Sequence, residues 1–534
     1  MNRVTCFLKN YIQPFERKLA MAELRTLAKS ELRAVAGHID SSIMFETDSE
    51  LAPQELASRL AYWEVVQAGF SQYTRQVRAE ATANVVRNGV QFTELQRILP
   101  FQGDVPLPNR RCLRYGTHGI HEYRGKFFPQ LVLALINISD LPAAGTVFDP
   151  MCGSGTALVE AVASGHSAYG LDLNPLSVLM ARTKCALLST PPGKIIDSYN
   201  RVREYLLQPN QSRSPQLIYF RALPEADRSY LAGWFSPQVI EDLDRISAYI
   251  HSLRQTPVTQ LMWLSLSNIL RAVSWQKEDD LRVRKEVRLD ADIDPIKEFL
   301  EELGRSVRLV VSLLVEKAFN EPGAHLIGEG DARTPLKHMA ALQNAVDLVI
   351  TSPPYATALP YLDTDRLSLI YLQLLTRPSH RARDHEMIGN REISNRLKDS
   401  YWARFHENKR TYPSRLVRLI EKIYRLNQNS GAGFRRQNLP PLLAKYFDDM
   451  RQVLMSFRSV LRNGASAFVV VGNNHTIAGG ERVEIETASL LQEVGESIGL
   501  KGAEAIPMEM LVSRDIFKKN ASASEYILHF KNYK

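Results

Sequence analysis

Residues 146–175 read TVFDPMCGSGTALVEAVASGHSAYGLDLNP, and their pattern decides the fold. A short apolar run ends at Asp149, a glycine-rich turn and a helical stretch follow, and a second apolar run ends at Asp172. Strand, turn, helix and strand in this order are typical of a βαβ unit, whose two strands are parallel. The stretch therefore predicts that an α/β sheet begins near residue 145.

Further apolar runs extend this sheet. Those at 325–331, 345–353 and 465–473 end in loop-forming residues, which is typical of the tips of buried parallel strands. Two more strand candidates, 502–511 and 524–531, are joined by about a dozen residues without a clear helix, and so short a link favours antiparallel pairing. We therefore expect a mostly parallel sheet with an antiparallel last strand.

The segments outside these strands have a different texture. Apolar residues three to five apart predict a helical N-terminal region, and similar stripes predict a helical insertion between the second and third strands. The expected division is a helical N-terminal region (1–110), the first part of the core (111–190), a helical insertion (191–320), the second part of the core (321–375), a basic insertion (376–445) and the C-terminal strands of the core (446–534).

The basic character of the chain is local. The 534 residues carry 66 Lys and Arg against 58 Asp and Glu, a net charge of +8. Residues 377–436 alone hold 15 basic and 6 acidic residues, which leaves a net charge of −1 for the rest. A local cationic surface attracts a polyphosphate partner. The alternative is a solvated helical face.

Cysteine usage and hydropathy indicate the compartment. None of the four cysteines belongs to a CxxC pair, which argues against a structural zinc site or a disulfide scaffold. Apolar runs such as 131–136 are too short for a bilayer, which requires about 20 residues. The first residues lack an apolar core followed by a cleavage site, so no signal peptide is expected. We expect a cytoplasmic protein without a bound metal.

The glycine-rich turn predicts a nucleoside-binding site. Gly153 and Gly155 allow a tight turn and a close approach to a ligand, and the next helix begins with free N–H groups. Asp172 ends the following strand, where a carboxylate can accept hydrogen bonds from ribose hydroxyls. The third glycine of the dinucleotide fingerprint is replaced by Leu158, which favours a nucleoside with a non-phosphate tail.

A second motif, TSPPY at 351–355, follows the apolar strand AVDLVI. Two consecutive prolines make a rigid, extended loop, because both φ angles are fixed. Such a loop can present a Ser hydroxyl and carbonyl oxygens to an exocyclic amino group while the Tyr ring stacks on the base.

Together DPMCGSGT (149–156), GLDLNP (170–175) and TSPPY (351–355) resemble the S-adenosylmethionine-dependent DNA amino-methyltransferases, which methylate exocyclic nitrogens of cytosine or adenine. The segment 118–136 resembles the stretch that precedes the glycine motif in that family. The resemblance implies a Rossmann-like methyltransferase sheet, S-adenosylmethionine as cofactor, double-stranded DNA as substrate, and a restriction or defence-system protein as a further partner.

The resemblance also implies roles for individual residues. The cofactor-binding set is Asp149, Pro150, Gly153, Gly155 and Thr156 in the first motif, Asp172 and Asn174 in the second, Asp331 after the third strand, and Phe127 or Phe128. The catalytic set is Ser352, Pro353, Pro354 and Tyr355. The DNA-contacting set rests on charge instead: the basic insertion follows the base-facing loop directly, and we expect it to contact DNA through Arg381, Arg383, Arg391, Lys409 and Arg410.

The residue before PPY bears on the acceptor base. Ser352 is typical of the cytosine-N4 members, while Asp or Asn is usual in adenine-N6 members, so we expect cytosine N4. The alternatives are an adenine-N6 DNA methyltransferase, an RNA amino-methyltransferase, and a catalytically inactive nucleic-acid-binding subunit of a modification or defence complex.

Overall fold

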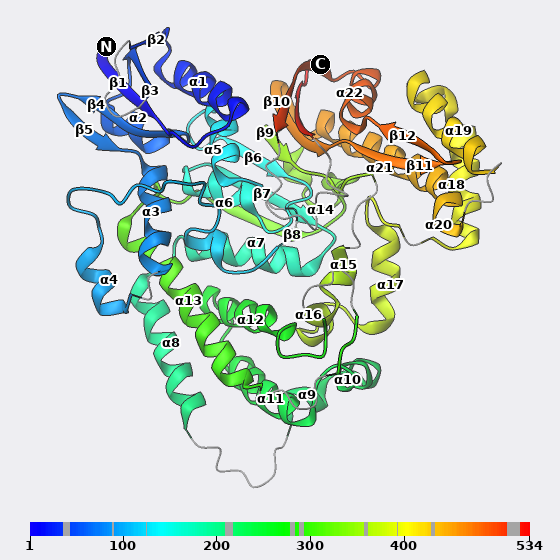
Figure 1. The fold of residues 1–534 in the computed structure, drawn as a ribbon, viewed down its shortest axis with the longest axis horizontal. Coiled ribbons are helices and arrows are strands. Elements are labelled where there is room, and N and C mark those ends of the chain that lie inside the picture. Colours follow the sequence, from blue (N-terminus) through cyan, green and yellow to red (C-terminus); the bar gives the residue numbers. More distant parts are fainter. Residues whose placement is uncertain are drawn as a thin grey trace.

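The computed structural model describes residues 1–35, 43–87, 90–123, 125, 127–208, 217–277, 284–287, 293–356, 361–391, 393–428, 433–509 and 524–534. A seven-stranded sheet lies at its centre (Figure 1), with the strand order β13-β14-β10-β9-β6-β7-β8. The strands are β6 (Thr146–Asp149), β7 (Ser167–Asp172), β8 (His325–Glu329), β9 (Val346–Thr351), β10 (Leu461–Gly472), β13 (Lys501–Glu509) and β14 (Ser524–Lys531). Positions 510 and 511 of the expected strand 502–511 lie outside the described residues.

The pairing confirms the predicted topology. Strands β6 to β10 pair in parallel, whereas β14 is antiparallel to both of its neighbours, β10 and β13. Alternate residues of β9 enter different apolar clusters: Leu348 and Ile350 join one, and Val349 joins the other. Both faces of the sheet are therefore covered, as buried parallel strands require. The fold is an α/β, Rossmann-like fold with an antiparallel last strand.

Helices provide both covering layers. The cluster that contains Leu348 includes apolar residues of α5 (Pro129–Ile138), α6 (Thr156–Ala163) and α7 (Pro175–Leu187). The cluster that contains Val349 includes residues of α21 (Leu439–Val460) and α22 (Thr487–Ser497). A two-stranded hairpin, β11 (Asn474–Ala478) with β12 (Glu481–Ile485), follows β10. Within the described part of the chain, no helix is long and apolar enough to cross a bilayer.

The N-terminal region contains a second sheet, so the expectation of a helical region over 1–110 is wrong. Its five strands pair antiparallel in the order β2-β3-β1-β4-β5. They are β1 (Asn2–Leu8), β2 (Arg33–Ala34), β3 (Ile43–Ser49), β4 (Trp63–Ala68) and β5 (Phe70–Tyr73), and the helices are α1 (Pro14–Ala28), α2 (Pro53–Arg59), α3 (Arg75–Arg87) and α4 (Phe92–Ile98). The helical spacing does belong to α1, but Val4, Cys6 and Leu8 are buried alternately, which is the period of a strand.

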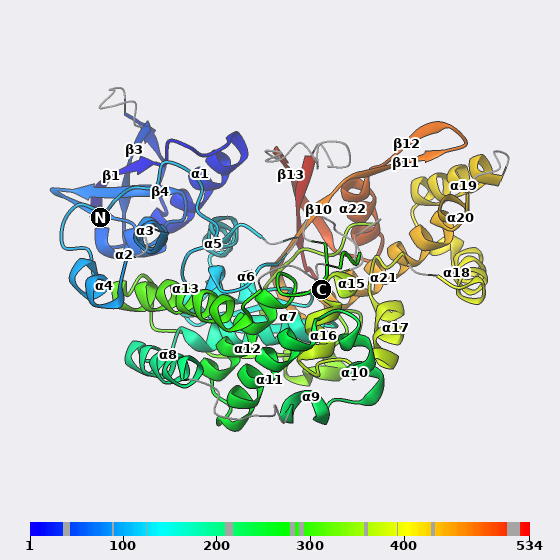
Figure 2. The ribbon, with the colours of Figure 1, turned by 60° about the horizontal axis from the view of Figure 1, so that its bottom comes forward.

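The two insertions are helical. The first consists of α8 (Pro192–Leu207), α9 (Ile218–Ala222), α10 (Glu225–Ala232), α11 (Pro237–Ser252), α12 (Pro257–Leu270) and α13 (Pro295–Glu316). Short helices α14 (Pro335–His338), α15 (Tyr361–Thr364) and α16 (Arg366–Tyr371) flank β9. The basic insertion consists of α17 (Arg377–Glu386), α18 (Asn395–Glu407), α19 (Ser414–Gln428) and α20 (Phe434–Gln437). The N-terminal region and α18–α20 lie at opposite ends of the molecule (Figure 2).

A buried ion pair anchors the N-terminal region to the core. Lys9 Nζ lies 2.7 Å from Glu80 Oε1, and the two side chains are 1% and 0% exposed. The same oxygen accepts hydrogen bonds from Gln76 in α3 and from Gln130 in α5, each at 3.0 Å. Because α5 packs on the central sheet, this network joins the two sheets.

Replacing Lys9 by Met should lower the free energy of unfolding by about 3–5 kcal/mol, because the buried Glu80 would lose its ion-pair partner Lys9. Arg3→Met is the matched control: Arg3 pairs with Glu46, but its side chain is 68% exposed, so the loss should be about 1 kcal/mol or less. Urea unfolding measures both. Equal losses in the two variants would contradict the anchoring role of Lys9.

Candidate functional site

The two sequence motifs meet where the strand order reverses. Strand β6 lies between β7, the next strand in the chain, and β9, which pairs with β10. In open α/β sheets this switch point, at the carboxyl ends of the strands, is where ligands bind. Here the Thr351 hydroxyl at the end of β9 donates a hydrogen bond of 2.7 Å to Asp149 Oδ1 at the end of β6. The structure therefore brings the glycine-rich turn and the SPPY loop together.

The glycine-rich turn depends on its two glycines. Gly153 and Gly155 have φ angles of +48° and +80°, and Gly155 is the N-cap of α6. A Cβ at Gly155 would lie 2.6 Å from the Ala181 methyl group, and one at Gly153 would lie 2.9 Å from the Tyr123 ring. Tyr123 thus lies on the turn, a position that the sequence analysis missed because no spacing rule links it to Gly153.

Asp172 is held by backbone N–H groups of the glycine-rich turn and of the loop that follows β7. Its Oδ2 accepts a hydrogen bond from Gly153 N and its Oδ1 accepts one from Asn174 N, both of 2.8 Å. A carboxylate has about four acceptor positions, so acceptors remain for a ligand. Asn174 itself caps α7 by accepting from Leu176 N at 3.0 Å, and its amide donates to Asp365 at 3.1 Å. Asn174 therefore shapes the loop through its protein contacts.

Two buried carboxylates give the site its electrostatic character. Burial raises the pKa of Asp149 to about 7 and the pKa of Asp172 to about 6. Hydrogen bonds oppose this rise, from Thr351 and Met151 N to Asp149 and from backbone N–H groups alone to Asp172. Among the described residues, neither carboxylate forms an ion pair with Lys, Arg or His. S-adenosylmethionine carries an ammonium, a sulfonium and ribose hydroxyls, all of which favour ionised carboxylates. The residues present therefore fit this cofactor.

The other predicted cofactor residues lie in varied surroundings. Pro150 and Thr156 are buried in the turn and at the start of α6, and Phe127 is half-buried against the core. Phe128 has the Arg111 guanidinium 4.5 Å above its ring centre. This contact engages one face of that ring.

Asp331 follows β8 and forms an ion pair with Arg333. Arg333 donates to both of its oxygens at 2.8–2.9 Å and pairs with Asp449 at 2.7 Å. Burial would raise the pKa of Asp331, but the hydrogen bonds and charge of Arg333 outweigh burial and lower that pKa. The Asp331 carboxylate would therefore bind Arg333 and the adenine amino group at the same time if the predicted contact forms.

The SPPY loop leaves β9 beside β10. The Ser352 hydroxyl donates to the Val470 carbonyl oxygen at 3.0 Å. Pro353 is buried, whereas Pro354 and Tyr355 are half-buried. The Tyr355 hydroxyl donates to Glu525 on β14, another residue that the sequence analysis missed.

The predicted DNA-contacting residues fall into two groups. Arg381, Arg391 and Arg410 are exposed. Lys409 forms an ion pair with Glu421 inside the insertion. Arg383 instead contacts the core, at the Leu173 carbonyl.

Arg383 holds α17 against the carboxyl ends of β7 and β8. Its Nη1 donates to the Leu173 carbonyl at 2.5 Å and lies 3.2 Å from Glu329, and its Nε lies 3.3 Å from Glu386. Leu173 directly follows Asp172, so Arg383 supports the loop after β7. Charge counting cannot distinguish such an arginine from one that faces solvent.

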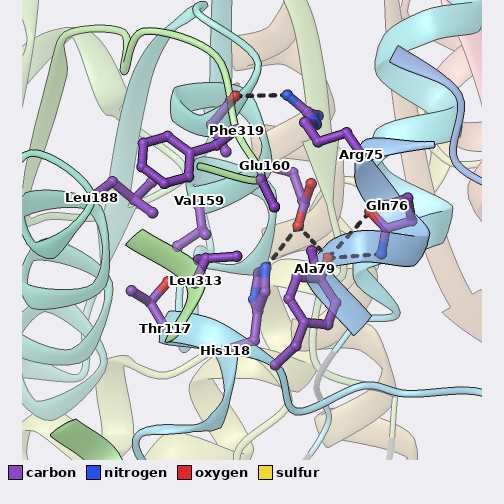
Figure 3. Close-up of a pocket in the computed structure, with 13 residues that line it drawn as sticks. Arg75, Gln76, Ala79, Thr117, His118, Val159, Glu160, Leu188, Leu313 and Phe319 are labelled. Atoms are coloured by element: carbon purple, nitrogen blue, oxygen red, sulfur yellow. Dashed lines mark hydrogen bonds and ion pairs between the residues drawn. The ribbon is translucent and has the colours of Figure 1, made fainter. Parts of the chain in front are cut away.

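A cavity lies behind α6, on the side of the N-terminal region (Figure 3). There Glu160 accepts hydrogen bonds from His118 at 2.7 Å and from Tyr115 at 2.8 Å, and Tyr115 contacts Gln76. None of the residues that line this cavity belongs to the predicted site. Its polar network connects α6 to α3. Among the described residues, no group of His, Cys, Asp and Glu could hold a metal ion.

Comparisons with known proteins agree with this geometry. The model of the UPF0020 family, described as an RMKL-like methyltransferase domain, matches residues 121–184, which include the glycine-rich turn and Asp172. Among curated proteins, the Type II methyltransferase M.MvaI of Kocuria varians is 26% identical over 52% of this chain and 63% of its own length. M.MjaII of Methanocaldococcus jannaschii is 23% identical over 46% and 60%, respectively. M.BsoBI of Geobacillus stearothermophilus is 24% identical over 74% and 81%.

The chain thus spans less than two thirds of the length of M.MvaI and M.MjaII. The solved rRNA methyltransferase AviRa from Streptomyces viridochromogenes matches with a TM-score of 0.27 and 13% identity over 77% of this chain and 88% of that one, a likeness too weak to support a conclusion. The sequence matches confirm the resemblance to S-adenosylmethionine-dependent DNA methyltransferases and imply S-adenosylmethionine as methyl donor.

The affinity for S-adenosylmethionine should depend on pH. A cationic, hydroxyl-bearing ligand stabilises the ionised carboxylates, so binding lowers the pKa of Asp149 and of Asp172 from about 7 and about 6. Affinity should therefore be full above about pH 8 and should fall as the pH drops through these values, by up to about tenfold per pH unit for each group. Calorimetric titration measures this.

The matched control for the pH experiment is Asp172→Asn. The ligand titrates in the same way with both proteins, so the difference in slope between wild type and variant belongs to Asp172. The variant should show the shallower pH dependence. Parallel slopes would mean that Asp172 does not contact the cofactor.

Two arginines of α17 should behave differently. Arg383→Ala removes the support of Leu173 and should weaken cofactor binding about three- to tenfold, the effect of one hydrogen bond. Arg381→Ala should leave cofactor affinity unchanged but weaken DNA binding and flatten its salt dependence. Calorimetry and DNA titration at several salt concentrations test the pair. If both substitutions weakened only DNA binding, Arg383 would belong to the DNA surface.

Proposed function

We propose that the chain is a DNA methyltransferase that transfers a methyl group from S-adenosylmethionine to the exocyclic N4 of a cytosine flipped out of the duplex. The observation that carries this proposal is the orientation of Ser352. Its hydroxyl donates to the Val470 carbonyl, next to the junction of Thr351 with Asp149. The proposal also draws on the names of the relatives, which are Type II methyltransferases.

The Ser352 hydrogen bond decides what the hydroxyl can offer to a base. A hydroxyl has one proton and two acceptor positions. With the proton given to Val470, Ser352 Oγ is left as an acceptor, which matches the N–H donors of an exocyclic amine. An adenine or cytosine amine is a poor nucleophile because its lone pair is conjugated with the ring. Acceptance of its N–H bonds by Ser352 and the Pro353 carbonyl favours tetrahedral nitrogen and makes the lone pair available.

The residues of the cofactor half of the site would hold the methyl donor in position. Asp172 would hold the ribose and Asp149 would lie beside the methionine part, with the Gly153 turn allowing close approach. The sulfonium of the cofactor supplies the methyl group. Because Thr351 joins Asp149 to the SPPY loop, the amine and the donor are held in one frame, and positioning is the main contribution to rate.

The remaining elements suit DNA. Flipping a base exposes a ring that needs a stacking partner, and Tyr355 follows the rigid prolines. The basic insertion presents Arg381, Arg391 and Arg410 to solvent, where they can neutralise phosphates. A DNA substrate together with the microbial Type II relatives supports a cytoplasmic enzyme. A modification role beside a restriction or defence protein follows from the Type II relatives.

The proposal predicts a modified nucleoside and the residue that it requires. Unmethylated plasmid DNA is incubated with the protein and S-adenosylmethionine, and its nucleosides are analysed by mass spectrometry. The wild type should produce N4-methylcytosine, and Ser352→Ala should lower the yield at least about a hundredfold while cofactor affinity is retained. Ser466→Ala, which alters a serine in the middle of β10, four residues before Val470, is the control.

The nucleoside analysis separates the alternatives. Detection of N6-methyladenine would mean that adenine, not cytosine, accepts the methyl group, and the class of reaction would stay the same. Absence of any methylated base with cofactor bound would contradict the proposed activity.

A further inference from the structure

Two contacts position the Tyr355 side chain, one on its ring and one at its hydroxyl. A Cβ at Gly472 would lie 3.0 Å from the Tyr355 ring and would press on it, so glycine at the tip of β10 makes room for the ring. The hydroxyl at the end of the same ring donates to Glu525. Two separate contacts therefore restrict where the ring can point.

The sheet register explains why these contacts coincide. In the antiparallel pair β10–β14, Gly472 lies opposite Glu525. The residue that makes room for the ring and the residue that accepts its hydroxyl are thus direct neighbours across two strands. This arrangement requires the antiparallel last strand, because it places the first residues of β14 at the carboxyl edge of the sheet.

Burying a carboxylate beside Tyr355 costs desolvation free energy, which filling the space does not require. Glu525 is half-buried, and burial raises its pKa although the hydrogen bond from Tyr355 lowers it. Removing a charged group from water is unfavourable unless it forms hydrogen bonds. An apolar side chain could fill the space without that cost, so the carboxylate points to a need for a hydrogen-bond acceptor.

We propose that Glu525 is a positioning residue that fixes the Tyr355 ring in the orientation required to stack on the flipped base. The inference rests on the proposed function, since Tyr355 needs a base to receive. A ring fixed beforehand loses no rotamer freedom when the base arrives, so the base is held more firmly in the reactive position. Glu525 lies on a strand that none of the sequence motifs includes.

A double-mutant cycle tests the role of Glu525. The variants are Glu525→Ala, Tyr355→Phe and the combination of both, measured by single-turnover methyl transfer from S-adenosylmethionine to unmethylated plasmid DNA. Each single variant should slow transfer about three- to tenfold, the range of one hydrogen bond. The double variant should be no slower than either single one, because both remove the same contact. Calorimetric affinity for S-adenosylmethionine should stay unchanged throughout.

Two further variants separate positioning from a structural role. Glu525→Gln keeps an acceptor oxygen and should restore most of the rate. Glu504→Ala removes an exposed carboxylate on the neighbouring strand β13 and should have no effect. Thermal unfolding checks that each variant is folded at the assay temperature. A structural role predicts a lower unfolding midpoint with an unchanged transfer rate of the folded protein.

The outcomes distinguish this inference from the proposed function. Wild-type transfer with unaltered rates in Glu525→Ala would overturn the role of Glu525 and leave the methyltransferase proposal intact. Additive losses in the double variant would also overturn it. A wild type that transfers no methyl group to DNA would contradict the proposed function and, with it, the role of Glu525.

Discussion

The hydrogen bond from Thr351 to Asp149 joins two parts of the chain that lie about two hundred residues apart, and the arrangement of the site depends on it. Asp149 ends the strand that leads into the glycine-rich turn, and Thr351 ends the strand that leads into the SPPY loop. The acceptor is buried and otherwise receives a hydrogen bond from Met151 N, so loss of Thr351 would remove one of the donors that stabilise a buried carboxylate. The bond sets the position of Ser352 relative to the glycine-rich turn.

Both insertions support this junction. In the first, Ser267 contacts His121 at 3.0 Å and the Asn268 side chain accepts from Glu122 N at 3.2 Å, directly before the Tyr123 that lies on Gly153. In the second, Arg383 supports the loop after Asp172. Long additions to a sheet are tolerated at loops, and here they also brace the site on two sides.

Much of the core could be predicted from sequence because its signals are local. An apolar run that ends in Asp149 or Asp172 records burial and a strand tip within a few residues. The N-terminal sheet was missed because the helical spacing of α1 dominated, although Val4, Cys6 and Leu8 alternate. Arg383 and Glu525 could not be assigned, since their partners lie far away in the chain and composition does not distinguish a paired charge from a solvated one.

The most direct measurement is calorimetric titration of Thr351→Val with S-adenosylmethionine, together with the rate of methyl transfer. Valine has nearly the same shape but no hydroxyl, so Asp149 keeps its burial and loses one donor. The affinity should be lower by about ten- to a hundredfold and transfer should be slower, since a hydrogen bond to a charged group is lost. Thr146→Val, at the start of β6, the strand that ends at Asp149, should change neither. Unaltered affinity and rate in Thr351→Val would contradict the claim that this hydrogen bond joins the two halves of the site.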